Sequence, residues 1–450
     1  MTKNVFIVGL NDANRRKLER LRGAENLRFH GVIAPAEVYD TEIFPIPEML
    51  RRAEAQLRAF DGPIDAVVGY MDFPVSTMLP LVCARFGLRT PSLESLLKCE
   101  HKYWSRLVQR EVIGENIPQF AAFDPFDDDA LRVVGEAGIG FPFFVKPIKS
   151  SGSRLGFRID SPENFSVAIA ELRAQIETIS EPFNFILDQA TMPEQVRAVD
   201  GRHCLAEEII GGHQCTVEGY VDAGEVVSYG IVDSIRYPQV ISFSRYQYPS
   251  RLPASIQRRM KELTRRVMEH TGFDHGAFNV EFFWDEPRDH IWLLEINTRI
   301  SQSHCELFEK VDGVSHQQVT VDLALGRHPS MPSREGRYAV AAKFFHRVFL
   351  PDALVTRAPS AGELATLEAT FPDATVAVQV HEGMKLSGLP EQDSYSYALA
   401  YVWIGAASTT SLLRTYGSVL RGLRLELARV DGELAGGAAL ALSEPIDRLT

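Results

Sequence analysis

Residues 276–304 constrain the fold of this chain more than any other stretch of the sequence. Two apolar, β-rich arms flank residues 285–289, a run of Asp, Glu, Pro, Arg and Asp that carries strong turn signals. The stretch is therefore expected to form an antiparallel hairpin over about 276–297. A sheet that contains this hairpin must be at least partly antiparallel.

The expected hairpin brings acidic and amide side chains together. With the turn centred on Arg288, Glu281 faces Glu295 and Asn279 faces Asn297, and alternation places all four side chains on one face. Cβ atoms of facing residues lie about 5 Å apart, so two carboxylates repel unless a cation neutralises them. Oxygen ligands suit the hard ions Mg²⁺ and Mn²⁺, which makes Glu281, Glu295 and Asn297 the candidate metal ligands. A solvated outer face is the alternative.

The opposite face of the ribbon is expected to be apolar and covered. Its members would be Phe282, Trp284, Leu294 and Ile296. Beyond the hairpin, Arg299 extends the acidic row with a guanidinium suited to phosphate or carboxylate. Ser303 and His304 follow and are candidates for substrate contact, with a structural role as the alternative for His304.

A second candidate element is a lysine followed by a loop of small residues. An apolar strand over 143–145 leads to Lys146, and the loop 150–156 reads Ser-Ser-Gly-Ser-Arg-Leu-Gly. Small residues let backbone N–H groups and hydroxyls close over phosphates, and the candidate residues are Ser151, Gly152 and Ser153. The loop lacks the GxxxxGK[ST] pattern, so it is not an ordinary P-loop, and a plain surface loop is the alternative.

A third candidate is the segment 206–212, a short strand that runs into a glycine turn. Its carboxylates and backbone groups could face the edge of an adenine ring, and a simple strand end is the alternative. The residues concerned are Glu207, Glu208, Ile209 and Ile210.

The rest of the chain reads as alternating strands and helices. Strand-like runs at 5–9 and 65–69, each followed by a helical stretch, predict a small parallel α/β domain over 1–95. Further helices are expected at 98–114, 162–178, 254–271 and 408–427. Further strands are expected at 184–189, 204–210, 215–222, 225–234, 338–344 and 375–380. The expected division is an N-terminal α/β domain (1–95), a central region (96–335), a C-terminal α+β subdomain (336–430) and a tail (431–450).

Composition excludes several classes of protein. The net charge of −12 over 450 residues argues against a general nucleic-acid binder, whose footprint is a basic excess. The longest uncharged apolar stretch, 397–407, is about half of a membrane span, and no export signal is visible. Five cysteines without a CxxC pair suit a reducing compartment, so the cytoplasm is the expected location.

Together these residues resemble the ATP-grasp superfamily, and in particular its carboxylate–amine (L-amino-acid) ligases. The resemblance extends over about residues 1–430. Its most specific part is the motif 295–299, Glu-Ile-Asn-Thr-Arg, preceded fourteen positions earlier by Glu281. Lys146 before the small-residue loop, the segment 207–211 and the pair His101–Lys102 occur in the order that the family has.

The resemblance implies a fold and a set of roles. The fold would be α/β and α+β, an ATP-grasp fold with an N-terminal parallel α/β domain, a two-lobed ATP-binding region and a C-terminal α+β subdomain. Lys102 and Lys146 would contact ATP, residues 150–156 would form the phosphate lid, and Arg299 would stabilise an acyl phosphate. Gln214 stands where relatives often have a ribose-binding glutamate, and Thr298 where they often have proline.

The implied activity is ATP-dependent joining of a carboxylate, of an amino acid or small organic acid, to an amine, as in dipeptide synthesis. The reaction would pass through an acyl phosphate and release ADP and phosphate, with Mg²⁺ or Mn²⁺ as cofactor. Two alternatives stay open: a formate- or bicarbonate-activating enzyme of purine-biosynthesis or biotin-carboxylase type, and a non-catalytic ATP-binding module. A homodimer is expected by analogy alone.

Overall fold

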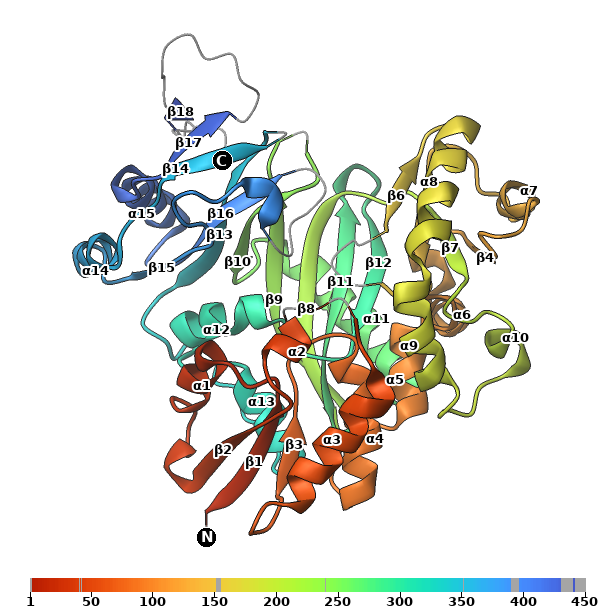
Figure 1. Ribbon diagram of the computed structural model, residues 1–450, viewed down its shortest axis with the longest axis horizontal. Coiled ribbons are helices and arrows are strands. Elements are labelled where there is room, and N and C mark those ends of the chain that lie inside the picture. The colour runs from red at the N-terminus through yellow and green to blue at the C-terminus, as the bar shows by residue number, and fades with distance from the viewer. Residues whose placement is uncertain are drawn as a thin grey trace. The chain divides into compact units, whose positions relative to one another are not determined.

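The structure is a computed structural model that describes residues 2–39, 41, 43–150, 155–238, 240–350, 352–389, 396–429 and 440–441 (Figure 1). It divides into two compact units. The first unit comprises Met1–Gly230, Leu252–Gln302 and His316–Met331, and the second comprises Ile231–Arg251, Ser303–Ser315 and Pro332–Thr450. The two units are described separately below.

The first unit begins with the parallel α/β segment that the sequence predicts. Strands β1 (Lys3–Val8), β2 (Leu27–Val32) and β3 (Ala66–Val68) form a parallel sheet in the order β2-β1-β3. Its helices are α1 (Asp12–Leu18), α2 (Ala36–Tyr39), α3 (Ile46–Arg58) and α4 (Val75–Phe86). The central strand is buried on both faces, as a covered parallel sheet requires.

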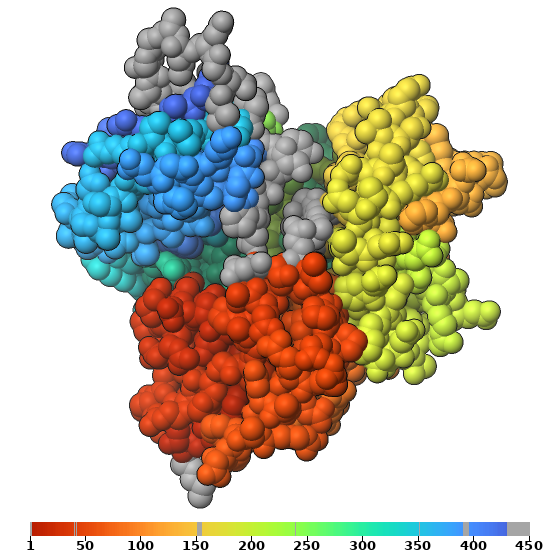
Figure 2. Space-filling view, in the orientation of Figure 1, coloured from red at the N-terminus to blue at the C-terminus, as the bar shows by residue number. Residues whose placement is uncertain are grey.

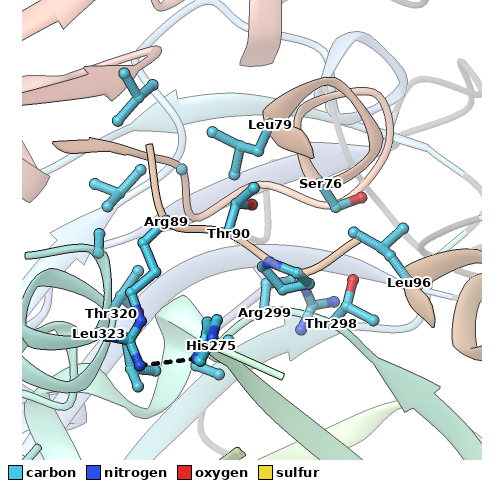
Figure 3. A pocket seen from close by; sticks show the side chains of 17 residues that line it. Ser76, Leu79, Arg89, Thr90, Leu96, His275, Thr298, Arg299, Thr320 and Leu323 are labelled. Carbon is cyan, nitrogen blue, oxygen red and sulfur yellow. Dashed lines mark hydrogen bonds between the residues drawn. The ribbon is translucent and has the colours of Figure 1, made fainter. Parts of the chain in front are cut away.

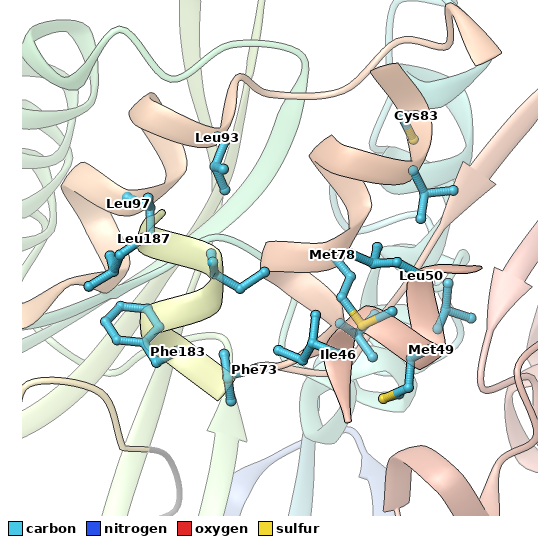
Figure 4. Close-up of a cluster of buried hydrophobic side chains, with 14 of the residues drawn as sticks. Ile46, Met49, Leu50, Phe73, Met78, Cys83, Leu93, Leu97, Phe183 and Leu187 are labelled. Carbon is cyan, nitrogen blue, oxygen red and sulfur yellow. The ribbon is translucent and has the colours of Figure 1, made fainter. Parts of the chain in front are cut away.

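Helix α9 (Glu177–Leu187) replaces the strand expected at 184–189. Its apolar run also fits a helix, because Ile179, Phe183 and Ile186 recur at helical spacing and are buried. Phe183 and Leu187 pack with side chains of the N-terminal segment in one core (Figure 4). The surfaces of the two segments also meet in Figure 2, where α3 contacts α9.

Helices and a small antiparallel sheet follow the N-terminal segment. The helix expected over 98–114 is two helices, α5 (Leu93–Glu100) and α6 (Lys102–Ile113). The sheet has the order β4-β7-β5-β6. Its strands are β4 (Phe120–Phe123), β5 (Phe143–Pro147), β6 (Phe157–Ile159) and β7 (Cys204–Glu208), and the further helices are α7 (Ala130–Glu136), α8 (Pro162–Gln175) and α10 (Glu194–Arg197).

The first unit also holds the hairpin. Strands β11 (Gly276–Asp285) and β12 (His290–Asn297) pair antiparallel, and β11 pairs on its other edge with β8 (His213–Asp222). Helices α11 (Ala254–Thr271) and α13 (Gln317–Ala324) both contact β11. Strand β9 (Glu225–Arg236) begins in this unit and ends in the second.

The second unit is an antiparallel sheet with helices. From residue 231 of β9 the order is β9-β10-β13-β16-β15, and a small sheet has the order β14-β17-β18. The strands are β10 (Phe243–Tyr248), β13 (Val340–Val348), β14 (Ala353–Arg357), β15 (Ala374–Val378), β16 (Tyr397–Ala406), β17 (Glu426–Arg429) and β18 (Leu440–Ala441). The helices are α12 (Cys305–Asp312), α14 (Ala361–Thr370) and α15 (Thr409–Gly422). The Phe344 ring stacks on Tyr416 of α15 at 3.9 Å in its core.

The mixed architecture confirms the predicted fold class, while the predicted domain boundaries at 95 and 335 stay predictions. Most of the expected tail, 431–450, lies outside the described residues. In the described ranges, no helix is both long and apolar enough to cross a membrane.

Candidate active site

The facing pairs predicted for the hairpin are confirmed. Glu281 pairs with Glu295 and Asn279 with Asn297. Asn297 Nδ2 donates to Asn279 Oδ1 at 2.9 Å and lies 3.5 Å from Glu281 Oε1, so these side chains share one face. Arg299 continues the row, because its guanidinium lies 3.4 Å from Asn297 Oδ1.

The strand register predicted next to the turn is wrong by one residue. The predicted pairing of Glu281 with Glu295 still holds, because a β-bulge shifts the register between this pair and the turn. Toward the tip Phe282 pairs with Leu293 and Asp285 with His290, so the turn does not centre on Arg288. The register shifts between Glu281 and Phe282, which leaves Leu294 as the extra residue of the bulge. Leu293, not Leu294 as predicted, is fully buried beside Phe282, and Leu294 is half-buried.

Strand β8 supplies the partner that orients Glu281. Gln214 is buried, and its Nε2 donates to Glu281 Oε2 at 3.0 Å. The register pairs Gln214 with Phe283 and Thr216 with Glu281, which places Gln214 on the same face of the sheet. The ribose contact expected for Gln214 stays a prediction, because the structure gives this side chain a partner within the protein.

Lys102 is the first residue of α6 and points at Glu295. Its Nζ donates to Ser150 O at 2.8 Å and lies 3.4 Å from Glu295 Oε1. His101 caps the helix: its Nδ1 accepts from the backbone N–H of Trp104 at 3.2 Å, and its Nε2 contacts Val199 O at 2.8 Å. Burial lowers the pKa of His101 to about 4, so the ring is neutral and can accept this hydrogen bond at neutral pH.

Burial and neighbouring charges have opposite effects on the pKa values of Lys102 and Glu295. Burial lowers the pKa of the Lys102 ammonium, and the charge of Glu295 only partly offsets that effect. Burial alone would raise the pKa of the Glu295 carboxyl, but the ammonium groups of Lys102 and Lys146 outweigh it and lower the pKa. Glu295 is therefore an anion at neutral pH, as a metal ligand must be.

Lys146 is the penultimate residue of strand β5 and forms an ion pair with Glu207 on the neighbouring strand β7. The Lys146 Nζ lies 2.6 Å from Glu207 Oε2, and the other carboxylate oxygen accepts from Arg106 Nε at 2.6 Å. Burial alone would raise the pKa of the Glu207 carboxyl, but Arg106 and Lys146 lower it to about 2. Glu207 is thus a buried anion that holds Lys146, a role that the sequence did not indicate.

Sequence reasoning missed a group of charged residues in contact with Arg299 and Thr298. Asp72 follows β3, and its carboxylate lies 3.1 Å from both Arg299 Nη2 and Lys149 Nζ. Lys149 also donates to Glu100 at 2.7 Å, and Glu100 in turn accepts from the Thr298 hydroxyl. Burial alone would raise the pKa of Asp72, but Lys149 and Arg299 lower it well below its usual range. The N-terminal segment therefore holds the arginine that the sequence singled out.

A buried acid extends the same face. Glu218 on β8 pairs with Asn279, is fully buried, and lies 3.7 Å from His316 Nδ1. Burial raises the pKa of the Glu218 carboxyl to about 7, and the charges of His316 and Arg299 only partly oppose that shift.

A cavity of about 60 Å³ is lined by Arg299 and Thr298 and by residues of the N-terminal segment, among them Ser76 and Leu79 (Figure 3). At its rim the Arg89 guanidinium contacts His275 Nδ1 at 2.9 Å and Asp222 Oδ1 at 2.7 Å. The volume suits a few water molecules and is too small for a nucleotide.

The remaining predicted residues are placed as follows. Glu208 and Ile209, at the end of β7, are exposed and Ile210 is half-buried. The backbone N–H of Glu208 donates to Gln119 O at 3.0 Å. Ser151, Gly152 and Ser153 lie outside the described residues. Ser303 and His304 belong to the second unit.

In that unit, Ser303 Oγ accepts from Lys343 Nζ at 3.0 Å, and the Lys343 ammonium lies 4.2 Å from the centre of the Tyr401 ring. His304 is buried against Tyr246, with ring centres 5.0 Å apart, which favours its structural role.

The donor set fits a magnesium ion. No cluster of three or more His, Cys, Asp or Glu side chains suitable for a metal occurs among the described residues. A site at the hairpin would therefore rest on two carboxylates and one amide oxygen, those of Glu281, Glu295 and Asn297. Mg²⁺ is held in this way, by few protein oxygens that leave positions for phosphates and water.

Comparison with known proteins identifies the central part of the chain. Residues 139–306, which include Lys146, Glu207 and the whole hairpin, match the family of ATP-grasp domains. Residues 139–306 are an ATP-grasp domain. The fold agrees: the chain superposes on an L-amino acid ligase from Bacillus licheniformis with a TM-score of 0.65, 14% identity and coverage of 94% of this chain and 98% of that one.

Two further proteins resemble the chain beyond the ATP-grasp domain. Carboxyaminoimidazole ribonucleotide synthase from Aspergillus clavatus superposes with a TM-score of 0.64, 17% identity and coverage of 94% of this chain and 98% of that one. The ATP-grasp enzyme fsqD of Aspergillus fumigatus is 21% identical over 324 residues, 66% of this chain and 54% of that protein. The chain spans about half the length of the curated relatives it matches.

Proposed function

We propose that the chain is an ATP-dependent ligase that joins a carboxylate to an amine through an acyl phosphate. The observation that carries this proposal is the pairing of Glu281 with Glu295 on one face, with the Lys102 ammonium 3.4 Å from Glu295. Two facing carboxylates can hold a divalent cation, and buried lysines beside them can bind phosphate oxygens, so the arrangement suits a nucleoside triphosphate with its cation. The ATP-grasp domain and the likeness to an L-amino acid ligase support the choice of reaction.

The residues divide the work between binding and stabilisation. Lys102 and Lys146 bind phosphate oxygens, and Arg299, held by Asp72, faces the carbonyl-bound phosphate. Glu281, Glu295 and Asn297 would hold Mg²⁺, which when bound neutralises charge on the phosphate oxygens. Ile209, which is exposed, and Ile210, which is half-buried, would offer backbone N–H and C=O groups to the adenine ring, whereas the N–H of Glu208 already donates to Gln119 O at 3.0 Å.

The reaction balances in two steps. A carboxylate oxygen of the substrate attacks the γ-phosphorus of ATP, the bond to the β–γ bridging oxygen breaks, and ADP leaves. The amine nitrogen then attacks the acyl carbon, phosphate leaves with its oxygen, and the nitrogen loses a proton to give the amide. Cations at Lys102, Lys146 and Arg299 stabilise the negative charge that develops on the phosphoryl group.

The experiment is a phosphate-release screen with ATP, Mg²⁺, and amino acids and organic acids offered singly and in pairs with amines. We expect ADP and phosphate to appear only with a matched acid and amine. Glu295→Gln should lower the rate by roughly 100-fold or more, since loss of even an outer-shell partner of a metal ligand costs about 10- to 100-fold. Glu286→Gln, exposed at the hairpin tip, is the matched control and should keep the wild-type rate.

Other products would contradict the proposal. Formation of AMP and pyrophosphate would refute acyl-phosphate chemistry, and ATP binding without turnover on the whole panel would favour a non-catalytic module. A bicarbonate- or formate-activating enzyme is the second candidate, because a carboxyaminoimidazole ribonucleotide synthase superposes about as well as the L-amino acid ligase. ADP release that depends on bicarbonate or formate, without any amino acid, would select it. The homodimer and the cytoplasmic location stay predictions. Light scattering would test the homodimer by measuring the molar mass in solution.

A further inference from the structure

Arg106 on α6 connects two parts of the site that the sequence did not link. Its side chain is buried, with 3% of its surface exposed. Nε donates to Glu207 Oε1 at 2.6 Å, Nη1 to Leu293 O at 3.1 Å and to Gln109 Oε1 at 2.6 Å, and Nη2 to Leu294 O at 2.7 Å. One guanidinium thus contacts both strand β7 and the bulged strand of the hairpin.

The first contact sets the charge around Lys146. Glu207 carries one negative charge and lies between two cations, Arg106 and Lys146. Because Arg106 neutralises Glu207, the pair leaves the charge of Lys146 uncompensated and available to a phosphate. Without Arg106, Lys146 and Glu207 would form a neutral pair.

The second contact holds the bulge. The ladder shifts by one residue beside Glu281, and a bulge leaves backbone groups without their regular ladder partners. Arg106 takes the carbonyl oxygens of Leu293 and Leu294, the two residues at the shift. Its planar fork can bind two carbonyls and a carboxylate at once, which an ammonium cannot do with the same geometry.

We propose that Arg106 is a positioning residue that serves ATP through Glu207 and Lys146, and the metal ion through the bulge that keeps Glu281 opposite Glu295. The proposal rests on the proposed function, since it assigns Lys146 to phosphate and the hairpin to Mg²⁺. A purely structural Arg106 would stabilise the fold without changing either ligand.

The variants separate the two roles. Arg106→Lys keeps the charge and removes the fork, and Arg106→Gln removes both. Arg106→Gln with Glu207→Gln removes the two opposite charges together, so no buried carboxylate loses its partner. Arg110→Gln is the matched control, because Arg110 lies one turn along the same helix and is exposed. Thermal melting of each variant establishes that it is folded.

Calorimetry with ATP in EDTA measures the charge effect without the metal. We expect Arg106→Gln to weaken ATP binding by roughly tenfold or more, the effect of one charge a few ångströms from a phosphate in a partly buried site. The double variant should bind ATP with a Kd within about threefold of the wild-type value. The same is expected of Arg106→Lys, which keeps the positive charge. A double variant that binds ATP no better than the single one would overturn this half of the proposal.

The Mg²⁺ concentration that half-saturates the ATP-induced thermal shift measures the effect on the bulge. Here Arg106→Lys should raise that concentration by about tenfold, because a lysine cannot hold both carbonyls. Folded variants that need no more Mg²⁺ than wild type would overturn this half. If the wild-type protein binds no ATP, the proposed function fails. If the wild-type protein binds ATP and the Arg106 variants bind ATP and Mg²⁺ as tightly, only the proposal for Arg106 fails.

Discussion

At the scale of single residues, the site contains buried charges that are each in contact with a charge of opposite sign. Asp72 holds Arg299, Glu100 holds Lys149, and Glu207 holds Lys146. A buried charge is tolerated only with such a partner, so each pair also fixes the position of its cation. The three carboxylates that hold cations come from three different elements: the loop after β3, helix α5 and strand β7.

Glu218 gives the protein a pH dependence that can be measured. Burial raises the pKa of its carboxyl to about 7 in the folded chain, from an ordinary value of 4.5. The folded state therefore binds the proton more tightly, and this contribution to stability is present below pH 4.5 and is lost as the pH rises through 7. In wild type, the ionisation of Glu218 should lower the free energy of unfolding by about 3 kcal/mol between pH 4.5 and 8. Glu218→Gln should not show this decrease.

The measurement is urea unfolding of wild type and Glu218→Gln across that pH range in EDTA. The difference in the free energy of unfolding should grow in favour of the variant as the pH rises. Glu225→Gln, exposed at the start of β9, should follow wild type at every pH. Parallel curves for wild type and Glu218→Gln would show that Glu218 does not titrate in this range.

At the scale of elements, a β-bulge and a helix cap fix the positions of residues that the sequence predicted for the site. The bulge acts on Glu281 and Glu295, and the cap acts on Lys102. The bulge at Leu294 absorbs the one-residue offset between the hairpin tip and the carboxylate pair. The neutral His101 ring caps α6 and so directs Lys102, its first residue, toward Glu295. These devices are local, but each depends on atoms from another segment, Arg106 for the bulge and Val199 O for His101.

Helix α9 makes a prediction at this scale. Phe183 is fully buried in the core that joins α9 to α3 (Figure 4). Phe183→Ala should lower the free energy of unfolding by about 3–5 kcal/mol, the usual cost of such a cavity. Urea unfolding would report the loss, and hydrogen exchange should rise in α3 and α9. Val167→Ala on α8, which is 71% exposed, should change stability by less than about 0.5 kcal/mol.

At the scale of the whole molecule, the charges of the site balance although the chain carries −12. The cations Lys102, Arg106, Lys146, Lys149 and Arg299 match the anions Asp72, Glu100, Glu207, Glu281 and Glu295 in number. Glu218 is left out of this count, because burial raises its pKa to about 7. ATP is anionic and Mg²⁺ is cationic, so each offsets part of the charge that the other brings to the site. Binding of the two is therefore expected to be cooperative.

The prediction is a thermal shift that needs both ligands. At a concentration one hundred times its Kd, MgATP should stabilise the folded protein by about 2.7 kcal/mol and raise the melting temperature. ATP in EDTA and Mg²⁺ without ATP should each give a smaller shift, and Glu281→Gln should abolish the difference. Equal shifts for ATP with and without Mg²⁺ would contradict the metal assignment.

The sequence by itself determined the local features of this protein. Period-two patterning and turn residues predicted the hairpin, and alternation placed Glu281, Glu295 and Asn297 on one face because neighbours on a strand are a fixed distance apart. The short apolar run at 184–189 was misassigned, since such a run fits a strand or a buried helix equally well. Only the tertiary structure decided that Asp72 and Arg106 belong to the site. Arg299 lies more than two hundred residues from Asp72, and Glu207 lies about one hundred residues from Arg106. The pairing of buried charges across such separations leaves no periodic signal in the sequence.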